Sequence, residues 1–219
     1  MLDSRSYNLE ELAIAVNPGD RRRMLPEVPP SCRAILDVGG GAGQTLLALS
    51  IEGAELLVSL DPDPESLSLG RELSESIKFV RGRGESLPFN DDSFDLVISR
   101  GAIPYMKIAD VLSEMARVTR PGGTLWATLH PFSMTLGELA DHLKRAELKG
   151  AIYRLYILAN GLTLHLFGRQ FRWPFSGGRY ESCQSSRGIA RSLAAAGFTD
   201  IRIDKRRFFV VTARKAETT

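Results

Sequence analysis

Cysteine and long apolar runs are both scarce in this chain of 219 residues. The two cysteines, Cys32 and Cys183, lie far apart in the sequence and match no metal-site spacing, so we expect free thiols, a reduced cytoplasmic setting and no bound metal. The most apolar stretch, residues 151–167, is interrupted by polar side chains and is shorter than the roughly 20 apolar residues of a membrane helix. The first residues include early acids and lack the apolar core of a signal peptide. These absences predict a cytoplasmic protein without a membrane span.

An excess of charge of either sign is also missing, because the formal net charge is only +2. Two short basic clusters, residues 21–23 and 205–207, are typical of solvated faces rather than of phosphate contacts. We therefore expect no nucleic-acid partner. The apolar content of 43% is ordinary for a globular protein, and the length allows one domain with a sizeable core, with or without an insertion.

Glycine, by contrast, is concentrated in one segment, residues 34–45, which reads AILDVGGGAGQT. An apolar run typical of a buried strand leads through Asp37 into four glycines among residues 39–43, and a polar pair that can open a helix follows. Glycine is needed where a chain turns sharply and where a ligand approaches bare backbone. A helix N-terminus there offers unpaired N–H groups. The segment predicts a nucleotide-like binding loop.

Apolar runs that suit buried strands alternate with segments of helical spacing along most of the chain. Residues 56–60, 77–80, 94–99 and 124–129 are expected to be strands, and residues 108–118 have the apolar spacing of a helix. Such alternation predicts an α/β protein with a doubly wound, mostly parallel sheet and right-handed crossovers. Two closing strands, residues 200–206 and 208–213, are separated by a short turn and predict a hairpin, so we expect seven strands with the last one antiparallel.

The periodic pattern divides the chain into three parts. Residues 1–30 are expected to be a helical segment with a proline-rich connector, and residues 31–130 together with 185–219 to be the core domain. The pattern is lost over residues 131–184, where we expect an insertion that carries a helix near residues 136–149 and covers a substrate.

The glycine spacing narrows the choice of ligand. No Gly-Lys-Ser/Thr follows, which excludes a Walker-type phosphate loop. A dinucleotide loop would place its third glycine at position 44, whereas here it is Gly43. Asp37 precedes the first glycine, and its negative charge would repel a pyrophosphate and attract a cation.

Four later motifs accompany LDVGGGAG in order: Asp61 after the second strand, GESLPFNDDSFDLVIS at residues 84–99, VTRPGGTLWAT at residues 118–128 and AAGFTDI near the end. Together they resemble the class I methyltransferases that use S-adenosylmethionine, a Rossmann-like family. Within that family the chain is most similar to the small-molecule branch, the methyltransferase type 11 proteins that include the ubiquinone and menaquinone biosynthesis methyltransferases. The resemblance covers most of the chain and implies S-adenosyl-L-methionine as the cofactor.

The resemblance also implies which residues contact the cofactor. Asp37 would attract the cationic methionine end, and Asp61 would accept hydrogen bonds from the two ribose hydroxyls. The whole set of implied cofactor contacts is Asp37, Gly39, Gly41, Gly43, Gln44, Asp61, Pro62, Gly84, Glu85, Ser86 and Ser99.

One residue departs from the family pattern, because Arg83 stands where relatives commonly have an aspartate that accepts from the adenine amino group. Arginine cannot accept a hydrogen bond. Three alternatives follow: Glu85 with the backbone of Gly84 and Ser86 holds the base, backbone groups hold it while Arg83 stacks on it, or Arg83 and Glu85 are a surface ion pair. Weakened cofactor binding is a separate expectation that the arginine allows.

The acceptor side is less defined. Methyl transfer from a sulfonium needs mainly alignment, which can supply roughly 7–11 kcal/mol, so no catalytic residue is assigned. Tyr105 and His130, after the fourth and fifth strands, are the candidates for lining or base roles. The insertion holds many aromatic residues, which predict either a lid over an apolar or aromatic small molecule or a small core of their own: Tyr153, Tyr156, Phe167, Phe171, Trp173, Phe175 and Tyr180. Three arginines among them would suit an anionic group on the acceptor: Arg169, Arg172 and Arg179.

Two other functions remain open from the sequence. The glycine loop could serve an NAD(P)-linked oxidoreductase of related fold, although its spacing opposes this. Arg83 could instead mark a non-catalytic methyltransferase-like binding protein. Neither the methyl acceptor nor the oligomeric state is predicted.

Overall fold

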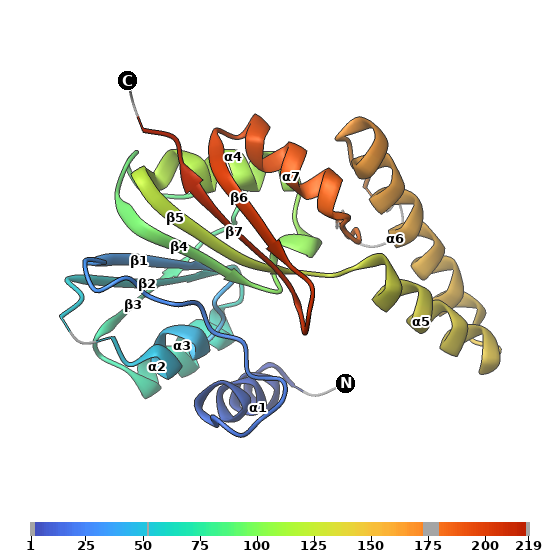
Figure 1. The fold of residues 1–219 in the computed structure, drawn as a ribbon. Coiled ribbons are helices and arrows are strands. Elements are labelled where there is room, and N and C mark those ends of the chain that lie inside the picture. Colours follow the sequence, from blue (N-terminus) through green and yellow to red (C-terminus); the bar gives the residue numbers. More distant parts are fainter. Residues whose placement is uncertain (1–2, 52, 173–179, 218–219) are drawn as a thin grey trace.

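The computed structural model describes residues 3–51, 53–172 and 180–217. These residues form one seven-stranded sheet with the spatial order β3-β2-β1-β4-β5-β7-β6 (Figure 1). Strands β1 to β5 run parallel, whereas β7 is antiparallel to both β5 and β6. The strands are β1 Ala34–Val38, β2 Leu56–Asp61, β3 Ile77–Arg81, β4 Phe94–Arg100, β5 Thr119–Leu129, β6 Phe198–Asp204 and β7 Phe209–Lys215. The predicted α/β fold with an antiparallel last strand is confirmed.

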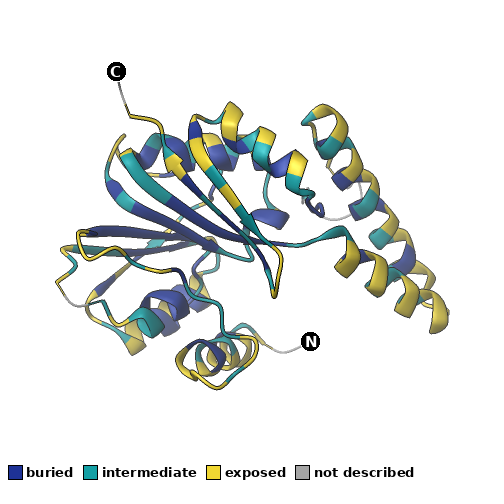
Figure 2. Cartoon of the chain, in the orientation of Figure 1, coloured by how far each residue is buried: buried dark blue, intermediate teal, exposed yellow. Residues whose placement is uncertain are grey.

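Helices cover the sheet on both faces. On one face lie α1 (Ser4–Val16), α2 (Gln44–Leu49) and α3 (Pro64–Leu73), and on the other lie α4 (Ile108–Val118) and α7 (Ser186–Ala195) (Figure 1). Both β1 and the middle of β4 are buried on the two faces, as Figure 2 shows, which explains their unbroken apolar sequences.

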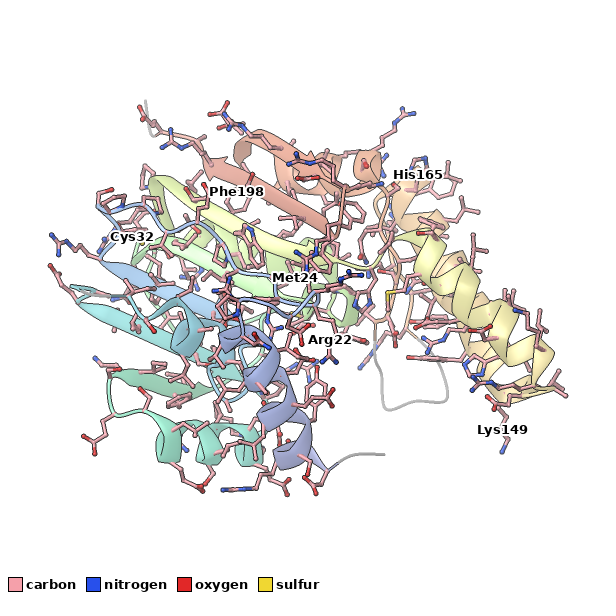
Figure 3. All side chains as sticks on the ribbon, turned by 60° about the horizontal axis from the view of Figure 1, so that its bottom comes forward. Arg22, Met24, Cys32, Lys149, His165 and Phe198 are labelled. Atoms are coloured by element: carbon pink, nitrogen blue, oxygen red, sulfur yellow. The ribbon has the colours of Figure 1, made fainter. Side chains whose placement is uncertain are left out.

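The stretch between α1 and β1 is extended and crosses the sheet without forming a helix. Met24 and Cys32, labelled in Figure 3, lie along this crossing and pack against the core cluster on the α2 side of the sheet. The thiols of Cys32 and Cys183 are both buried and unpaired, and burial raises the pKa of each to about 11.

Two local predictions differ from the structure. The fifth strand was expected over residues 124–129, but β5 begins at Thr119 and contains an irregularity, where the pairing jumps from Phe94 with Thr119 to Leu96 with Thr124. The helix expected near residues 136–149 is present with different bounds, and a second helix was missed. The chain forms α5 (Phe132–Lys144) and α6 (Leu148–Phe167).

The break between α5 and α6 lies at Ala146, which adopts a left-handed φ of 56°. Its N–H donates to the carbonyl of Leu143, so the chain reverses there. The left-handed region favours glycine, and an alanine in it gives no sequence signal. The two helices form a hairpin that projects from the sheet, with Lys149 near its tip and His165 near the body (Figure 3).

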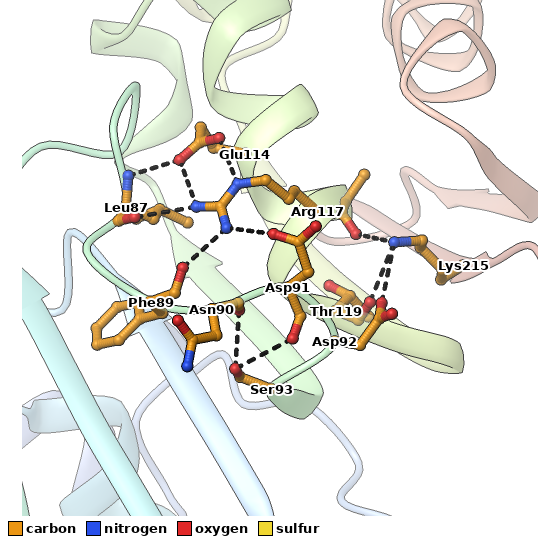
Figure 4. A network of polar contacts seen from close by, with 11 residues as sticks. Leu87, Phe89, Asn90, Asp91, Asp92, Ser93, Glu114, Arg117, Thr119 and Lys215 are labelled. Atoms are coloured by element: carbon orange, nitrogen blue, oxygen red, sulfur yellow. Dashed lines mark hydrogen bonds and ion pairs between the residues drawn. The ribbon is translucent and has the colours of Figure 1, made fainter.

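A polar network fixes the segment between β3 and β4 (Figure 4). The guanidinium of Arg117 on α4 donates to the carbonyls of Leu87 at 3.0 Å and Phe89 at 2.8 Å, and pairs with Asp91 and Glu114. Glu114 in turn accepts from the N–H of Leu87 at 2.7 Å. A loop with few buried side chains is thereby tied to a core helix.

None of the helices in the described ranges is long and apolar enough to cross a membrane. The same residues contain no group of three histidine, cysteine or acidic side chains that could hold a metal ion.

Candidate active site

Three cavities follow one another along the edge where the parallel strands end. The loop cavity, about 270 Å³, lies between the glycine loop, the end of β2 and α1. The central cavity, about 800 Å³, lies beyond β4 and β5, and the hairpin cavity, about 310 Å³, lies against α5 and α6. Tyr7, Glu11 and Arg100 line both the loop and the central cavity, while Tyr105 and His130 line both the central and the hairpin cavity. Two ligands, one in each of two neighbouring cavities, would therefore lie close to each other.

The glycine loop is fastened to the end of β2. The N–H groups of Gly39 and Gly40 both donate to the carbonyl of Leu60, at 2.8 and 3.2 Å. Gly39 has a φ of 72°, and a Cβ there would come within 2.3 Å of the Cβ of Ala102, so only glycine fits. The glycine loop therefore packs directly against Ala102, with no room for a side chain between them.

Asp37 is fully buried directly beneath this loop. A Cβ on Gly40 would approach its carboxyl carbon to 2.8 Å. Neither carboxylate oxygen finds a hydrogen-bond partner among the described residues. Burial raises the pKa of Asp37 to about 7, and the nearby charge of Arg100 and the neighbouring hydroxyl of Thr45 oppose the shift, although that hydroxyl makes no hydrogen bond of good geometry to the carboxyl. A buried carboxyl without partners is costly, so the site is incomplete without a proton or a cation.

Asp61, the last residue of β2, faces the loop cavity. One oxygen accepts from the N–H of Gly41 at 3.0 Å and the other from the N–H of Asp63 at 2.9 Å. Burial raises the pKa of this carboxyl, and the two N–H donors oppose the shift. Because each carboxylate oxygen can accept more than one hydrogen bond, Asp61 is oriented and still able to accept from a ligand.

Helix α1 supplies a residue that the sequence did not indicate. The side-chain oxygen of Asn8 accepts from the N–H of Ala42 at 3.1 Å and from the side chain of Gln44 at 2.6 Å. Its amide nitrogen donates to Ser66 on α3 at 2.9 Å. Asn8 thus joins α1 to the glycine loop, across a sequence distance that no local motif spans.

Arg100, at the end of β4, is the second residue that sequence reasoning missed. Its guanidinium donates to Glu11 at 2.8 Å and to the hydroxyl of Thr45 at 3.2 Å. The side chain is only 11% exposed and stands in the wall between the loop and central cavities. Its position directly after the fourth strand was the available signal, because ligands of such sheets bind at the strand ends.

The structure brings together part of the predicted cofactor set. Gly39, Gly41, Gln44 and Asp61 line the loop cavity. Gly43 instead begins α2 in a left-handed conformation, where a Cβ would press on Phe79 at 3.1 Å. Pro62 is exposed beside Asp61, and its carbonyl accepts from Arg81.

The remaining predicted contacts lie away from these cavities. Ser99 is fully buried and donates to the carbonyl of Val38 at 2.9 Å, so its hydroxyl is used inside the sheet. Gly84 fits closely against Met106 and Val111. The N–H of Ser86 donates to the carbonyl of Arg83, which closes a tight turn.

Arg83 and Glu85 do form an ion pair, at 3.6 Å, and the arginine side chain is 74% exposed. The other oxygen of Glu85 accepts from the N–H of Lys107 at 3.2 Å. The surface ion pair, one of the three alternatives from the sequence, is therefore present.

Tyr105 and His130 face each other edge to face, with ring centroids 5.4 Å apart. Burial raises the pKa of Tyr105 to about 12, so its hydroxyl stays protonated. Burial and the charge of Arg154 lower the pKa of His130, so its imidazole is neutral near pH 7. Of the two candidates, only His130 can accept a proton there.

The hairpin cavity is polar. Tyr153 donates to the buried carboxylate of Glu181 at 2.5 Å, and Arg154 lies 3.7 Å from Glu181 and 3.3 Å from Glu138. These charges come from α5, α6 and the segment before α7, so they meet only in the folded chain.

The aromatic residues of the insertion are divided between packing and surface. Tyr156 packs edge to face on Phe171 at 5.4 Å and belongs to a small cluster with Ile157 and Cys183, so of the two alternatives from the sequence these aromatics follow the small core. The cause is α6, which turns Tyr156 toward residues 180–184. The other predicted residues are placed as follows: Tyr153 lines the hairpin cavity, Arg172 stacks on Tyr180, Phe167 and Arg169 are exposed, and Trp173, Phe175 and Arg179 lie outside the described residues.

Residues 36–127, which include the glycine loop and β1 to β4, match the family model described as a methyltransferase domain. An uncharacterized methyltransferase of Mycobacterium sp. (strain JLS) is 39% identical over 113 residues, 48% of this chain and 44% of that protein. The uncharacterized methyltransferase YcgJ of Bacillus subtilis is 34% identical over 125 residues, 52% of this chain and 49% of YcgJ. The chain spans about half the length of the curated relatives it matches.

Solved structures extend the likeness to nearly the whole fold. An S-adenosylmethionine-dependent methyltransferase from Methanosarcina mazei aligns with a TM-score of 0.60 at 20% identity, covering 87% of this chain and 95% of that one. A methyltransferase in complex with the Haloferax volcanii Trm112 methyltransferase activator aligns with a TM-score of 0.62 at 20% identity, covering 99% and 94%. At these identities the likeness is one of fold, and it includes the α5–α6 region.

Proposed function

We propose that this chain, which belongs to the class I S-adenosylmethionine-dependent methyltransferases through residues 36–127, transfers a methyl group to a small organic molecule held in the central cavity. The observation that carries the proposal is the unpartnered carboxyl of Asp37 under the glycine loop. A cationic ligand lying on that loop would supply the partner that the fold itself lacks.

The residues of the loop cavity fit S-adenosylmethionine. Asp37, buried beneath the loop rather than lining the cavity, would attract its positively charged methionine end, and Asp61, already oriented by two N–H donors, would accept from the ribose hydroxyls. When bound, the cofactor supplies the activated methyl group. A pyrophosphate, in contrast, would bring negative charge above a buried carboxyl, which opposes the oxidoreductase alternative.

The central cavity suits the methyl acceptor. Its volume of about 800 Å³ is in the range of small-molecule sites, and its walls include Leu129, Phe132 and Phe209. We therefore propose an acceptor with an apolar or aromatic body. Lys205 and Arg207 stand at its rim and favour an anionic substituent.

The chemical demands on the protein are mainly positional. Arg100, held by Glu11 and Thr45, keeps the wall between the two cavities fixed, which orients two ligands toward each other. Neutral His130 would take the proton that the acceptor loses, whereas protonated Tyr105 could hydrogen-bond the acceptor but not act as the base.

Titration calorimetry with S-adenosylhomocysteine tests this function. We expect the wild type to bind, Asp61→Ala to lose at least about tenfold in affinity through its missing charged acceptor, and the exposed control Asp141→Ala to bind normally. Tight binding of a nicotinamide nucleotide with none of S-adenosylhomocysteine would favour the oxidoreductase. Binding of neither would favour the non-catalytic alternative.

A further inference from the structure

The helical hairpin carries an unusual share of exposed apolar surface. Of the 15 large hydrophobic residues that are exposed in the described part of the chain, 10 lie between Met134 and Phe171. Contiguous exposed apolar surface of this kind marks interaction sites in folded proteins. The yellow outer faces of α5 and α6 in Figure 2 show how little of the hairpin is covered.

On α6 this surface is an ordered stripe. Its members are exposed apolar residues separated by alternating steps of four and three positions: Leu148, Ile152, Leu155, Ala159, Leu162 and Leu166. The five large ones are between 48% and 71% exposed. At the helical rotation of about 100° per residue, all six lie within one narrow face. This is the spacing of the seam through which two helices pack side by side.

The opposite face of α6 is already in use. Tyr156, Ile157, Asn160 and Leu164 are buried against α5, α7 and residues 180–184, and Arg191 of α7 donates to the last carbonyls of the helix. A helix with two apolar faces is normally covered on both of them. Here one side has its neighbours within the chain, and the other is exposed, with no neighbour among the residues that the structure describes.

We propose that the α6 stripe is the interface of a homodimer, in which two copies of this helix pack antiparallel about a two-fold axis. The stripe is symmetric about its midpoint, so an antiparallel copy places Leu148 opposite Leu166, Ile152 opposite Leu162 and Leu155 opposite Ala159. An isologous contact of this type needs one self-complementary patch, which the stripe provides.

Charge and area both support a second copy as the occupant. The face holds no charged residue, so nothing in it selects a different partner or repels an identical one. At roughly 100 Å² for each large side chain with its flanks, pairing buries on the order of 1,000 Å² in total, the low end for a specific interface. The hairpin projects beyond the sheet, so two bodies can approach through it (Figures 1 and 3). We expect a dimer that dissociates on dilution.

Sedimentation velocity over a wide concentration range tests the proposal. The wild type should shift from dimer to monomer on dilution, and Leu155→Glu with Leu162→Glu should raise the dissociation constant by about 100-fold or more, because dimerisation would then bury carboxylates in an apolar seam that offers them no partner. Leu73→Glu, at a 39% exposed leucine on α3, is the matched control and should dimerise normally. Unchanged circular dichroism and S-adenosylhomocysteine binding would show that the double variant is folded. A wild type that is monomeric at every concentration overturns the proposal. Binding of such a monomer to lipid vesicles would show instead that the α6 stripe contacts a membrane surface.

Disulfide trapping tests the antiparallel arrangement. The double variant Leu155→Cys with Ala159→Cys should cross-link on oxidation far faster than Ala159→Cys alone, because each new thiol then lies opposite its partner in the other copy. Equal rates for the single and double variants would contradict this arrangement. The native cysteines are buried and do not compete.

Discussion

The glycine loop and the helical hairpin depart from ordinary folding rules in opposite ways. Beneath the loop, the carboxyl of Asp37 is buried without a partner, and on the hairpin the stripe of α6 is apolar without cover. Both are costly in the isolated chain. The difference lies in what each one needs: the loop needs a charge, and the stripe needs a surface. Departures of this kind are expected at functional sites, where a ligand or partner completes the structure.

Replacing the buried carboxyl should have the largest effect. Burial raises the pKa of Asp37 from 3.8 to about 7 in the native state, so between these values the native protein holds a proton that the unfolded chain has released. The free energy of unfolding should therefore fall as pH rises through this window and stay low above it, by about 4 kcal/mol at most. Asp37→Asn should remove this loss and, at pH above 7, stabilise the free protein.

Urea unfolding of the wild type and Asp37→Asn across that pH window measures the difference. The same substitution should weaken S-adenosylhomocysteine binding. Higher stability together with weaker binding would show that the carboxyl destabilises the free protein but serves the ligand. Asp141→Asn, at an exposed aspartate, is the control and should follow the wild type. Parallel pH curves for wild type and Asp37→Asn would contradict the proposed cost of burial.

The second effect concerns the acceptor side. If neutral His130 takes the acceptor's proton, His130→Gln should lower kcat by roughly 100-fold and leave S-adenosylhomocysteine affinity unchanged. Because the pKa of His130 lies below its ordinary 6.5, the wild-type rate should rise with pH only below that value and be flat above it. In the variant, the rate should no longer rise with pH in this range. A variant that keeps both its rate and this rise would place the proton acceptor elsewhere.

A smaller effect tests the polar network that ties the segment between β3 and β4 to α4. Arg117→Met removes donors from two backbone carbonyls and two carboxylates, so we expect a loss of about 2 kcal/mol in the free energy of unfolding. Chemical denaturation measures it. Arg206→Met, whose arginine is 91% exposed, should change stability by less than about 0.5 kcal/mol. Equal losses would mean that the network contributes nothing specific.

The smallest effect is expected at Arg83. Its ion pair with Glu85 is exposed, so Arg83→Ala should change stability by less than about 0.5 kcal/mol. S-adenosylhomocysteine affinity should stay within about threefold by calorimetry if the backbone and Glu85 hold the adenine, because an exposed arginine contributes little. A large loss would show instead that Arg83 stacks on the base.

The sequence was informative where a single segment determines the structure. The run through Asp37 into the glycines predicted strand, turn and helix, because positive φ angles and close backbone approach need glycine. Asp61 followed from its place at a strand end. Asn8 could not be predicted, since its partner Ala42 comes from a distant part of the chain, and for Arg100 only its place at the end of the fourth strand was a signal, not its contact with distant Glu11.

The hairpin shows the opposite case. The spacing of leucines on α6 is visible in the sequence, but spacing alone does not tell a core face from an exposed one. The turn at Ala146 gave no signal because alanine seldom adopts a left-handed conformation. Tertiary contacts decide both features.

The two buried thiols have a practical consequence for following this molecule in solution. With the pKa of each raised to about 11, Cys32 and Cys183 react slowly with thiol reagents near neutral pH. Tyr7 is 55% exposed and borders both the loop and the central cavity. A single cysteine introduced there could carry a fluorescent dye, and its emission would report the filling of either cavity in real time.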